Sequence, residues 1–207
     1  MEPPVDVLVV LAHPRPDSLG TALAAAVTTA ARSAGARVAC HDLYADGFDP
    51  RLSAAESLGP AFSDDLARRY ADELVAADAV VVVHPVWFFG PPGILRGWVE
   101  RVVREGVAFD VGARGEVTGR LRAREVLVIT TGNAGPATES ALGEPVTRFW
   151  RDVVFAPSGV PETLRLAFAP VRDSTAEERT EWLRRAASSS EGLVERMRTY
   201  GVSHLAQ

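Results

Sequence analysis

The sequence predicts an α/β fold in which a doubly wound parallel sheet of five strands is covered by helices on both faces. Two observations lead to this prediction. The segments 5–12, 79–84 and 125–131 consist almost entirely of small or branched apolar residues, which is typical of interior strands buried on both sides. Segments with the apolar spacing of helices separate these runs, and such an alternation favours parallel strands joined by helical crossovers.

The order of the elements predicts a flavodoxin-like strand order, 2-1-3-4-5, and a single domain that spans residues 1–207. Gly35 is expected to end the first helix, because glycine accommodates the left-handed position after a helix. Two connections, 43–63 and 105–124, exceed the usual loop length and are candidates for function or subunit contact. The expected strands are 5–12, 37–42, 79–84, 125–131 and 163–169, and the expected helices are 18–34, 64–77, 93–104, 144–155 and 175–198.

Composition excludes several classes of protein. The net charge is −5 and there is no basic block, so no nucleic-acid partner is expected. Cys40 is the only cysteine, which excludes an internal disulfide and favours a reducing compartment. No apolar run approaches the ~18 residues of a membrane span, and no signal peptide is evident. We therefore expect a cytoplasmic protein.

Missing residue types and motifs narrow the chemistry further. The chain contains no lysine, which excludes a P-loop nucleotidase and Schiff-base or pyridoxal chemistry. It also lacks the G-x-S-x-G and G-x-G-x-x-G motifs of hydrolases and resident dinucleotides. His41 and His204 are expected to be incidental surface or strand-end residues, His84 a packed histidine and Cys40 a small buried residue. No metal site is expected, because the carboxylates lack ligand spacing.

Three strand ends carry residues suited to a ligand, and parallel strands bring such ends to one edge of the sheet. The first is a loop that precedes a helix start, where backbone N–H groups could hold a phosphate, although Ser18 could also be only a helix cap. The second is an aromatic corner, in which three consecutive rings cannot all point inward. The third is a polar segment with a glycine. The candidate residues are His13, Ser18, Leu19 and Gly20, then Pro85, Val86, Trp87, Phe88 and Phe89, and then Thr130, Thr131, Gly132 and Asn133.

A phosphate site, an aromatic wall and a polar edge on one rim are the features that a flavin requires. Its ring system is planar, one end of the ring is apolar, the other end forms hydrogen bonds, and its tail is anionic. The sequence therefore predicts a flavin site.

These segments together resemble the NAD(P)H:quinone oxidoreductase family, the flavodoxin-like diaphorases. The most distinctive match is HPVWFFGPPGILRGWVERVVREGVAFD, in which Arg96 replaces the usual lysine. Weaker matches are AHPRPDSLGTAL, HDLYADGFDP and GRLRAREVLVITTGNAG, so the resemblance covers roughly residues 5–135. The resemblance implies that the flavin is FAD, with FMN possible, and that the protein is a homodimer with its site at the subunit interface. It also implies that the first group of candidate residues contacts the flavin phosphates and tail. The second group would line the flavin ring, and the third would lie at its polar edge.

The sequence departs from the family at two places. The better-known members carry a tyrosine and a histidine after the Thr-Thr-Gly segment, whereas residues 133–162 contain neither, so no catalytic residue is assigned. Gly20 stands where asparagine is common, which weakens the link to the adenine half of FAD.

The expected function is a two-step redox cycle. NAD(P)H would pass a hydride to flavin N5 and leave, and a quinone or another small aromatic acceptor would then be reduced in the same place. Three alternatives are a flavin-dependent azo- or nitroreductase, a non-catalytic ancillary subunit of an ion-efflux system, and a flavodoxin-type electron carrier. The aromatic corner followed by the GWVERV helix argues against the electron carrier.

Overall fold

The computed structural model describes residues 4–59 and 61–205, with side chains described as far as Tyr200. Five parallel strands form one sheet in the order β2-β1-β3-β6-β7, which confirms the expected flavodoxin-like order because β6 and β7 are the fourth and fifth strands of that sheet. The strands are β1 (Asp6–Leu11), β2 (Arg37–Asp42), β3 (Ala79–Pro85), β6 (Glu125–Thr131) and β7 (Glu162–Phe168).

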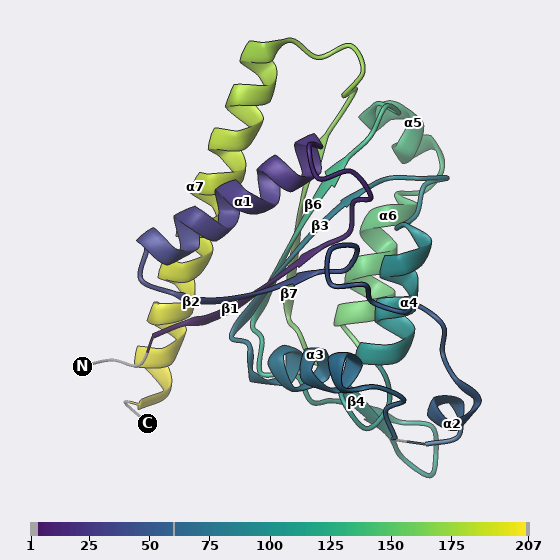
Figure 1. Cartoon of the computed structure of the whole chain (residues 1–207). Helices are drawn as coiled ribbons and strands as arrows, with labels where there is room; N and C mark the ends of the chain where they lie inside the picture. The colour runs from purple at the N-terminus through teal and green to yellow at the C-terminus, as the bar shows by residue number, and fades with distance from the viewer. Residues whose placement is uncertain (1–3, 60, 206–207) are drawn as a thin grey trace.

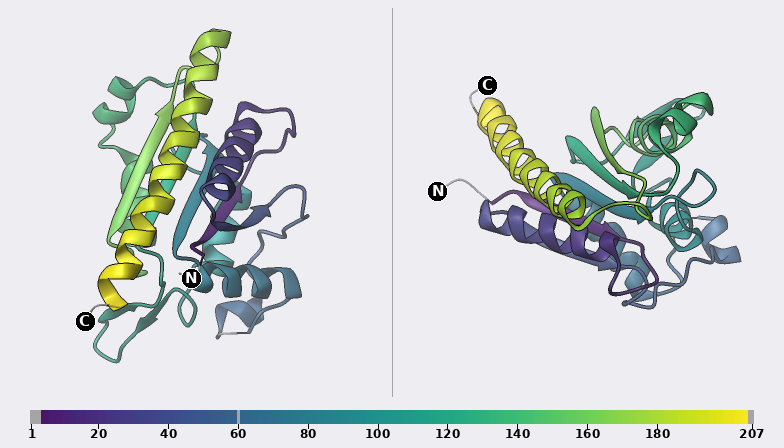
Figure 2. Two further views of the ribbon diagram at one scale, coloured as in Figure 1. Left: turned by 90° about the vertical axis from the view of Figure 1, so that its left-hand side faces the viewer. Right: turned by 90° about the horizontal axis from the view of Figure 1, so that it is seen from above.

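Helices cover both faces of this sheet (Figures 1 and 2). One face carries α1 (Leu19–Ser33) and the long α7 (Ala176–Leu205), which lie against each other. The other face carries α3 (Asp65–Ala76), α4 (Gly93–Val102), α6 (Pro145–Arg148) and a π-helical segment η1 (Phe149–Phe155). None of the helices within the described residues is long and apolar enough to cross a membrane.

Alternate residues of each central strand enter two separate cores, because successive side chains of a strand point to opposite faces. Val80 and Val82 pack with the α3–α4 side, whereas Val81 and Val83 pack with the α1–α7 side. Every residue of β3 and β6 is buried, which explains why these strands lack an alternating polar pattern. Gly35 has a φ of +82° and follows Ala34, the C-cap of α1, which confirms the expected helix end.

The structure adds four elements that the sequence pattern did not predict. The connection 43–63 contains α2 (Ala54–Ser57), and the connection 105–124 contains the antiparallel strands β4 (Phe109–Val111) and β5 (Val117–Gly119). The polar segment after β6 forms α5 (Pro136–Ala141). The expected helix 144–155 is divided into α6 and η1, because its second half adopts π-helical geometry.

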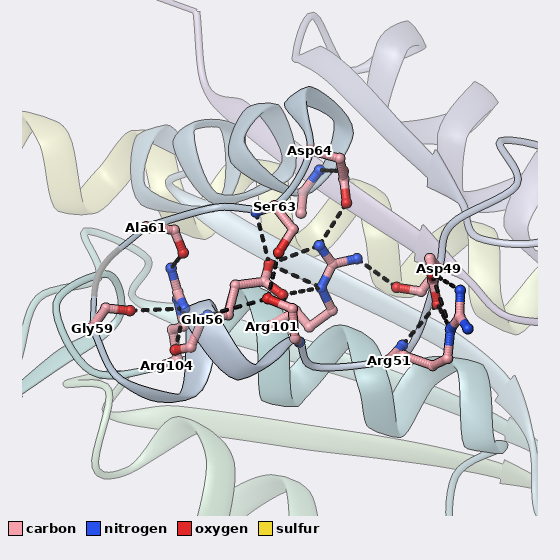
Figure 3. Close-up of polar contacts among 11 residues, drawn as sticks. Asp49, Arg51, Glu56, Gly59, Ala61, Ser63, Asp64, Arg101 and Arg104 are labelled. Atoms are coloured by element: carbon pink, nitrogen blue, oxygen red, sulfur yellow. Dashed lines mark hydrogen bonds and ion pairs between the residues drawn. The ribbon is translucent and has the colours of Figure 1, made fainter.

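A buried ion pair fixes the long connection 43–63 onto α4 (Figure 3). Arg101 and Glu56 have side chains that are 1% and 0% exposed, and their closest nitrogen–oxygen distance is 2.7 Å. Arg101 also bonds to Asp64 at 2.6 Å. Burial raises the pKa of Glu56, but hydrogen bonds from Arg101, Ser53 and Ser63 outweigh this effect and hold the pKa at about 2. The loop is therefore an integral part of the fold.

Two predictions for β2 are wrong. Cys40 is exposed rather than buried, and His41 is fully buried rather than incidental. His41 stacks on Tyr70 with ring centroids 3.5 Å apart, and its Nε2 lies 2.7 Å from a carboxylate oxygen of Glu73. The side chain of His204 lies outside the described residues.

Candidate functional site

A pocket of about 370 Å³ lies at the carboxyl ends of β3, β6 and β7. Backbone hydrogen bonds join the strand ends. The amide of Val86 donates to the carbonyl of Thr131 at 2.7 Å, and the amide of Gly132 donates to the carbonyl of Phe168 at 3.0 Å. This edge of the sheet is where doubly wound folds bind ligands, and the volume lies in the range of small-molecule sites.

The aromatic corner after β3 is a tight two-residue turn. Trp87 and Gly90 exchange backbone hydrogen bonds of 3.1 and 3.0 Å, and Phe88 and Phe89 between them have φ values of +50° and +56°. Left-handed values at both central positions define a type I′ turn, which favours Asn-Gly. Two phenylalanines here are strained, and Phe88 is fully exposed at 106%. Both residues line the pocket.

The opposite wall of the pocket presents hydrogen-bond donors. The guanidinium of Arg165 donates to the hydroxyl oxygen of Thr130 from Nε and Nη2, at 3.1 and 3.0 Å, so the hydroxyl proton of Thr130 remains for a ligand. The side-chain oxygen of Asn133 accepts from the amide of Arg172 at 2.9 Å, which leaves the NH₂ group of Asn133 to donate. Such a wall suits the carbonyl oxygens of a flavin or a quinone.

A buried histidine supports the aromatic corner from behind. His84 is fully buried, as predicted for a packed histidine, and burial lowers its pKa to about 4. Its Nε2 accepts a 2.9 Å hydrogen bond from the indole of Trp150, and its Nδ1 donates to the carbonyl of Pro85 at 2.8 Å. The neutral ring therefore carries its proton on Nδ1 and fixes the peptide at the start of the corner.

The loop after β1 lies on the neighbouring strand end and outside the pocket. Ser18 is the N-cap of α1 and accepts from the amide of Thr21 at 3.0 Å, which matches the capping role considered for it. His13 lies against Gly20, and its Nδ1 accepts from the amide of Arg15 at 3.1 Å, so Nε2 can donate. Burial lowers the pKa of His13. No hydrogen bond engages the amides of Leu19 and Gly20 among the described residues, and helix-start amides bind anions.

The structure brings most of the candidate residues of the second and third segments together. Thr131 points away from Thr130 because neighbouring strand residues alternate, and Trp87 is 44% exposed beside the pocket. The first group of candidates, His13 and Ser18–Gly20, lies at the same edge of the sheet but not in this pocket. The pocket itself contains six candidates, namely Val86, Phe88, Phe89, Thr130, Gly132 and Asn133.

Sequence reasoning missed the charged residues of the pocket. Glu139 and Arg165 form an ion pair of 2.5 Å with side chains that are 11% and 9% exposed, and Thr147 accepts a further bond from Arg165 at 3.1 Å. Glu144 also lines the pocket and has a φ of +55°. The Gly143-Glu144-Pro145 motif is the kind of turn signal that could have drawn attention to this segment, which was expected only to begin a helix.

The strand order defines a flavodoxin-like α/β protein, whose pocket lies at the carboxyl ends of β3, β6 and β7, next to the β1/β3 switch point of the sheet. A comparison with known families gives the same class. The chain belongs to the second flavodoxin family, described as having a flavodoxin-like fold, and the profile of that family matches residues 6–158.

Similar proteins carry related names. The NAD(P)H dehydrogenase [quinone] 1 of Rattus norvegicus is 31% identical over 147 residues, which cover 62% of this chain and 54% of that protein. A solved NAD(P)H:quinone oxidoreductase from Methanothermobacter marburgensis has a TM-score of 0.80 and 21% identity, and covers 92% of this chain and 100% of its own. An FMN-dependent NADH-azoreductase from Bacillus anthracis str. Ames Ancestor, solved with FMN, has a TM-score of 0.71 and 15% identity, with coverage of 93% and 99%.

The chain spans little more than half of the length of the curated relatives it matches. The family expected from the sequence is nevertheless confirmed, since the profile match covers most of the chain.

Proposed function

We propose that this protein is a flavin-dependent oxidoreductase that oxidises NAD(P)H and reduces quinones or similar aromatic acceptors. The observation that carries the proposal is the pocket formed by a strained aromatic turn on one side and hydrogen-bond donors on the other. Strained non-glycine backbone is retained at functional sites more often than elsewhere. The names of the relatives support the same activity.

The residues present fit a flavin. Val86, Phe88 and Phe89 would contact the ring, with Pro85 and Trp87 beside them, and the donors Thr130 and Asn133 would bind its carbonyl edge, with Thr131 and Gly132 completing that segment. The unengaged amides of Leu19 and Gly20 would hold the phosphate, together with the Nε2 proton of His13 and the capped helix start at Ser18. Both FAD and FMN fit this proposal.

Bound flavin would supply the hydride chemistry, because it accepts two electrons from a nicotinamide and passes them on. The chain's own residues would hold the flavin ring, position the nicotinamide or the acceptor against it, and exclude water from the contact between the two rings. Phe88 and Trp87 leave a large aromatic surface exposed, which also supports the proposal of a homodimer with its site at the subunit contact.

Purification followed by a visible spectrum tests the flavin, and mass analysis of the compound released on denaturation identifies it. We expect a yellow protein, steady oxidation of NADH or NADPH in the presence of a quinone, and weaker flavin retention in Trp87→Ala. Tyr200→Ala removes an aromatic side chain of similar exposure, 46% against 44% for Trp87, from outside the pocket and is the matched control. A panel with azo and nitro acceptors ranks the alternatives. Protein that stays colourless in excess FMN and FAD contradicts the proposal, and bound flavin without turnover favours the ancillary-subunit alternative.

A further inference from the structure

The pocket contains three ionisable side chains, and two of them neutralise each other. They are Glu139, Glu144 and Arg165. Arg165 donates to Glu139 at 2.5 and 2.9 Å, to Thr147 at 3.1 Å and to Thr130 at 3.1 and 3.0 Å. A guanidinium has five N–H groups, and these five bonds use all of them. The one cation of the pocket therefore has no donor left for an anionic ligand.

Glu144 is different, because its carboxylate is exposed and no hydrogen bond or ion pair engages it among the described residues. The charges of Arg165 and Glu139 cancel, so the carboxylate of Glu144 gives the pocket a net charge of one negative unit. A neighbouring like charge disfavours an anionic ligand, and the effect is largest where salt does not screen it.

The backbone holds Glu144 at a cost. The amide of Glu144 donates to the carbonyl of Glu139, and the amide of Gly143 donates to the carbonyl of Ser140. These two bonds form the Schellman pattern that ends α5. Gly143 takes the usual left-handed position with a φ of +75°, yet Glu144 is left-handed as well at +55° and stands before Pro145. A residue before proline favours an extended conformation, so a glutamate here is strained.

The three non-glycine residues with positive φ among the described residues are Phe88, Phe89 and Glu144, and all three line this pocket. Two of them are the aromatic wall of the proposed site. Strain gathered in one pocket indicates that Glu144 belongs to the same functional site as the two phenylalanines.

We propose that Glu144 sets the charge selectivity of the acceptor site, so that neutral or cationic aromatic acceptors are accepted and acceptors with a sulfonate or carboxylate beside the ring are rejected. The proposal rests on the proposed function, because it takes the electron acceptor to meet a bound flavin at this pocket. Arg165 cannot attract an anionic acceptor while its guanidinium is paired with Glu139.

The test compares 1,4-naphthoquinone with its 2-sulfonate in the flavin-loaded wild-type protein and in Glu144→Gln. We expect the ratio of kcat/KM for the sulfonate to that for the neutral quinone to rise roughly 3- to 10-fold at ~0.01 M ionic strength. The rise should shrink toward no change at ~1 M salt, where charges are screened. Glu191→Gln, an exposed α7 residue with the same change in net charge, should leave the ratio unaltered.

Dissociation constants of both quinones from quenching of tryptophan fluorescence give a readout that does not need turnover. A shift in the ratio of these constants in Glu144→Gln without turnover in any variant sustains the selectivity while the proposed function fails. Turnover with an unchanged ratio, an equal change for both quinones, or no binding of either quinone overturns the role of Glu144. Glu144→Lys should move the ratio further in favour of the sulfonate.

Discussion

The indole nitrogen of Trp150 donates a 2.9 Å hydrogen bond to His84, and the same imidazole donates to the carbonyl of Pro85 at 2.8 Å. This chain of bonds links the π-helical segment η1 to the first residue of the aromatic corner. Both side chains are fully buried, so each polar group depends on the other for a partner. The position of the corner is thereby coupled to the packing of η1.

Trp150→Phe should lower the free energy of unfolding by about 1–3 kcal/mol, because His84 Nε2 would remain buried without a donor. Urea denaturation followed by circular dichroism measures the change. Trp182→Phe keeps the stacked ring on Phe168 and removes no such bond, so it should cost less. Equal costs in the two variants would show that the hydrogen bond contributes nothing of its own.

Stability should fall with acidification because burial lowers the pKa of His84 to about 4 and that of His41 to about 3. An unfolded histidine takes up its proton near pH 6.5, so between about pH 6.5 and 4 the unfolded chain binds more protons than the folded one. Each histidine contributes a loss of up to about 1.4 kcal/mol per pH unit over this window. His84→Gln should reduce the slope measured by urea denaturation at pH 7, 6 and 5. An unchanged slope would show that His84 does not titrate as described.

Phe88→Asn should stabilise the flavin-free protein by about 1 kcal/mol, because asparagine tolerates the first position of a type I′ turn and the ring it replaces is exposed. The same change should weaken flavin binding, since one aromatic side of the pocket is lost. Thermal unfolding and flavin titration measure the two effects. Phe88→Leu keeps the strain and serves as control. A less stable Phe88→Asn protein would mean that the turn is not strained.

Arg101→Met should destabilise the protein by about 3–5 kcal/mol, because Glu56 would remain buried as an unpaired charge. The connection 43–63 should then become sensitive to limited proteolysis. Arg184→Met removes an exposed ion pair to Glu181 and should cost no more than about 1 kcal/mol. Resistance of the connection in Arg101→Met would argue that other contacts hold it.

The fold was predictable because burial on two faces requires nearly continuous apolar strands, as in Val80–Val83 of β3. The division of 144–155 was not, since the wider i→i+5 turn of a π-helix shifts the apolar positions too little over seven residues to be distinguished from an α-helix. The faces of β2 were misjudged, because Cys40 and His41 are adjacent and the pattern of an edge strand does not state which side is covered.

The site was predictable where its residues are adjacent in sequence, as in Phe88 and Phe89. The pair of Glu139 and Arg165 was not, because it joins α5 to β7 across 26 positions and depends on the register of β6 with β7. The positive φ of Glu144 likewise depends on the turn that ends α5 and starts α6. Such relations exist only after the chain has folded.

Exposure of Cys40 on β2 has a practical consequence. β2 and β7 are opposite margins of the sheet, and the pocket lies at the β3, β6 and β7 ends. A gold electrode would therefore capture the protein through one thiol in a uniform orientation, with the proposed flavin pocket turned away from the support. Under the proposed function, voltammetry of such a monolayer would follow electron exchange with bound flavin without a dissolved mediator.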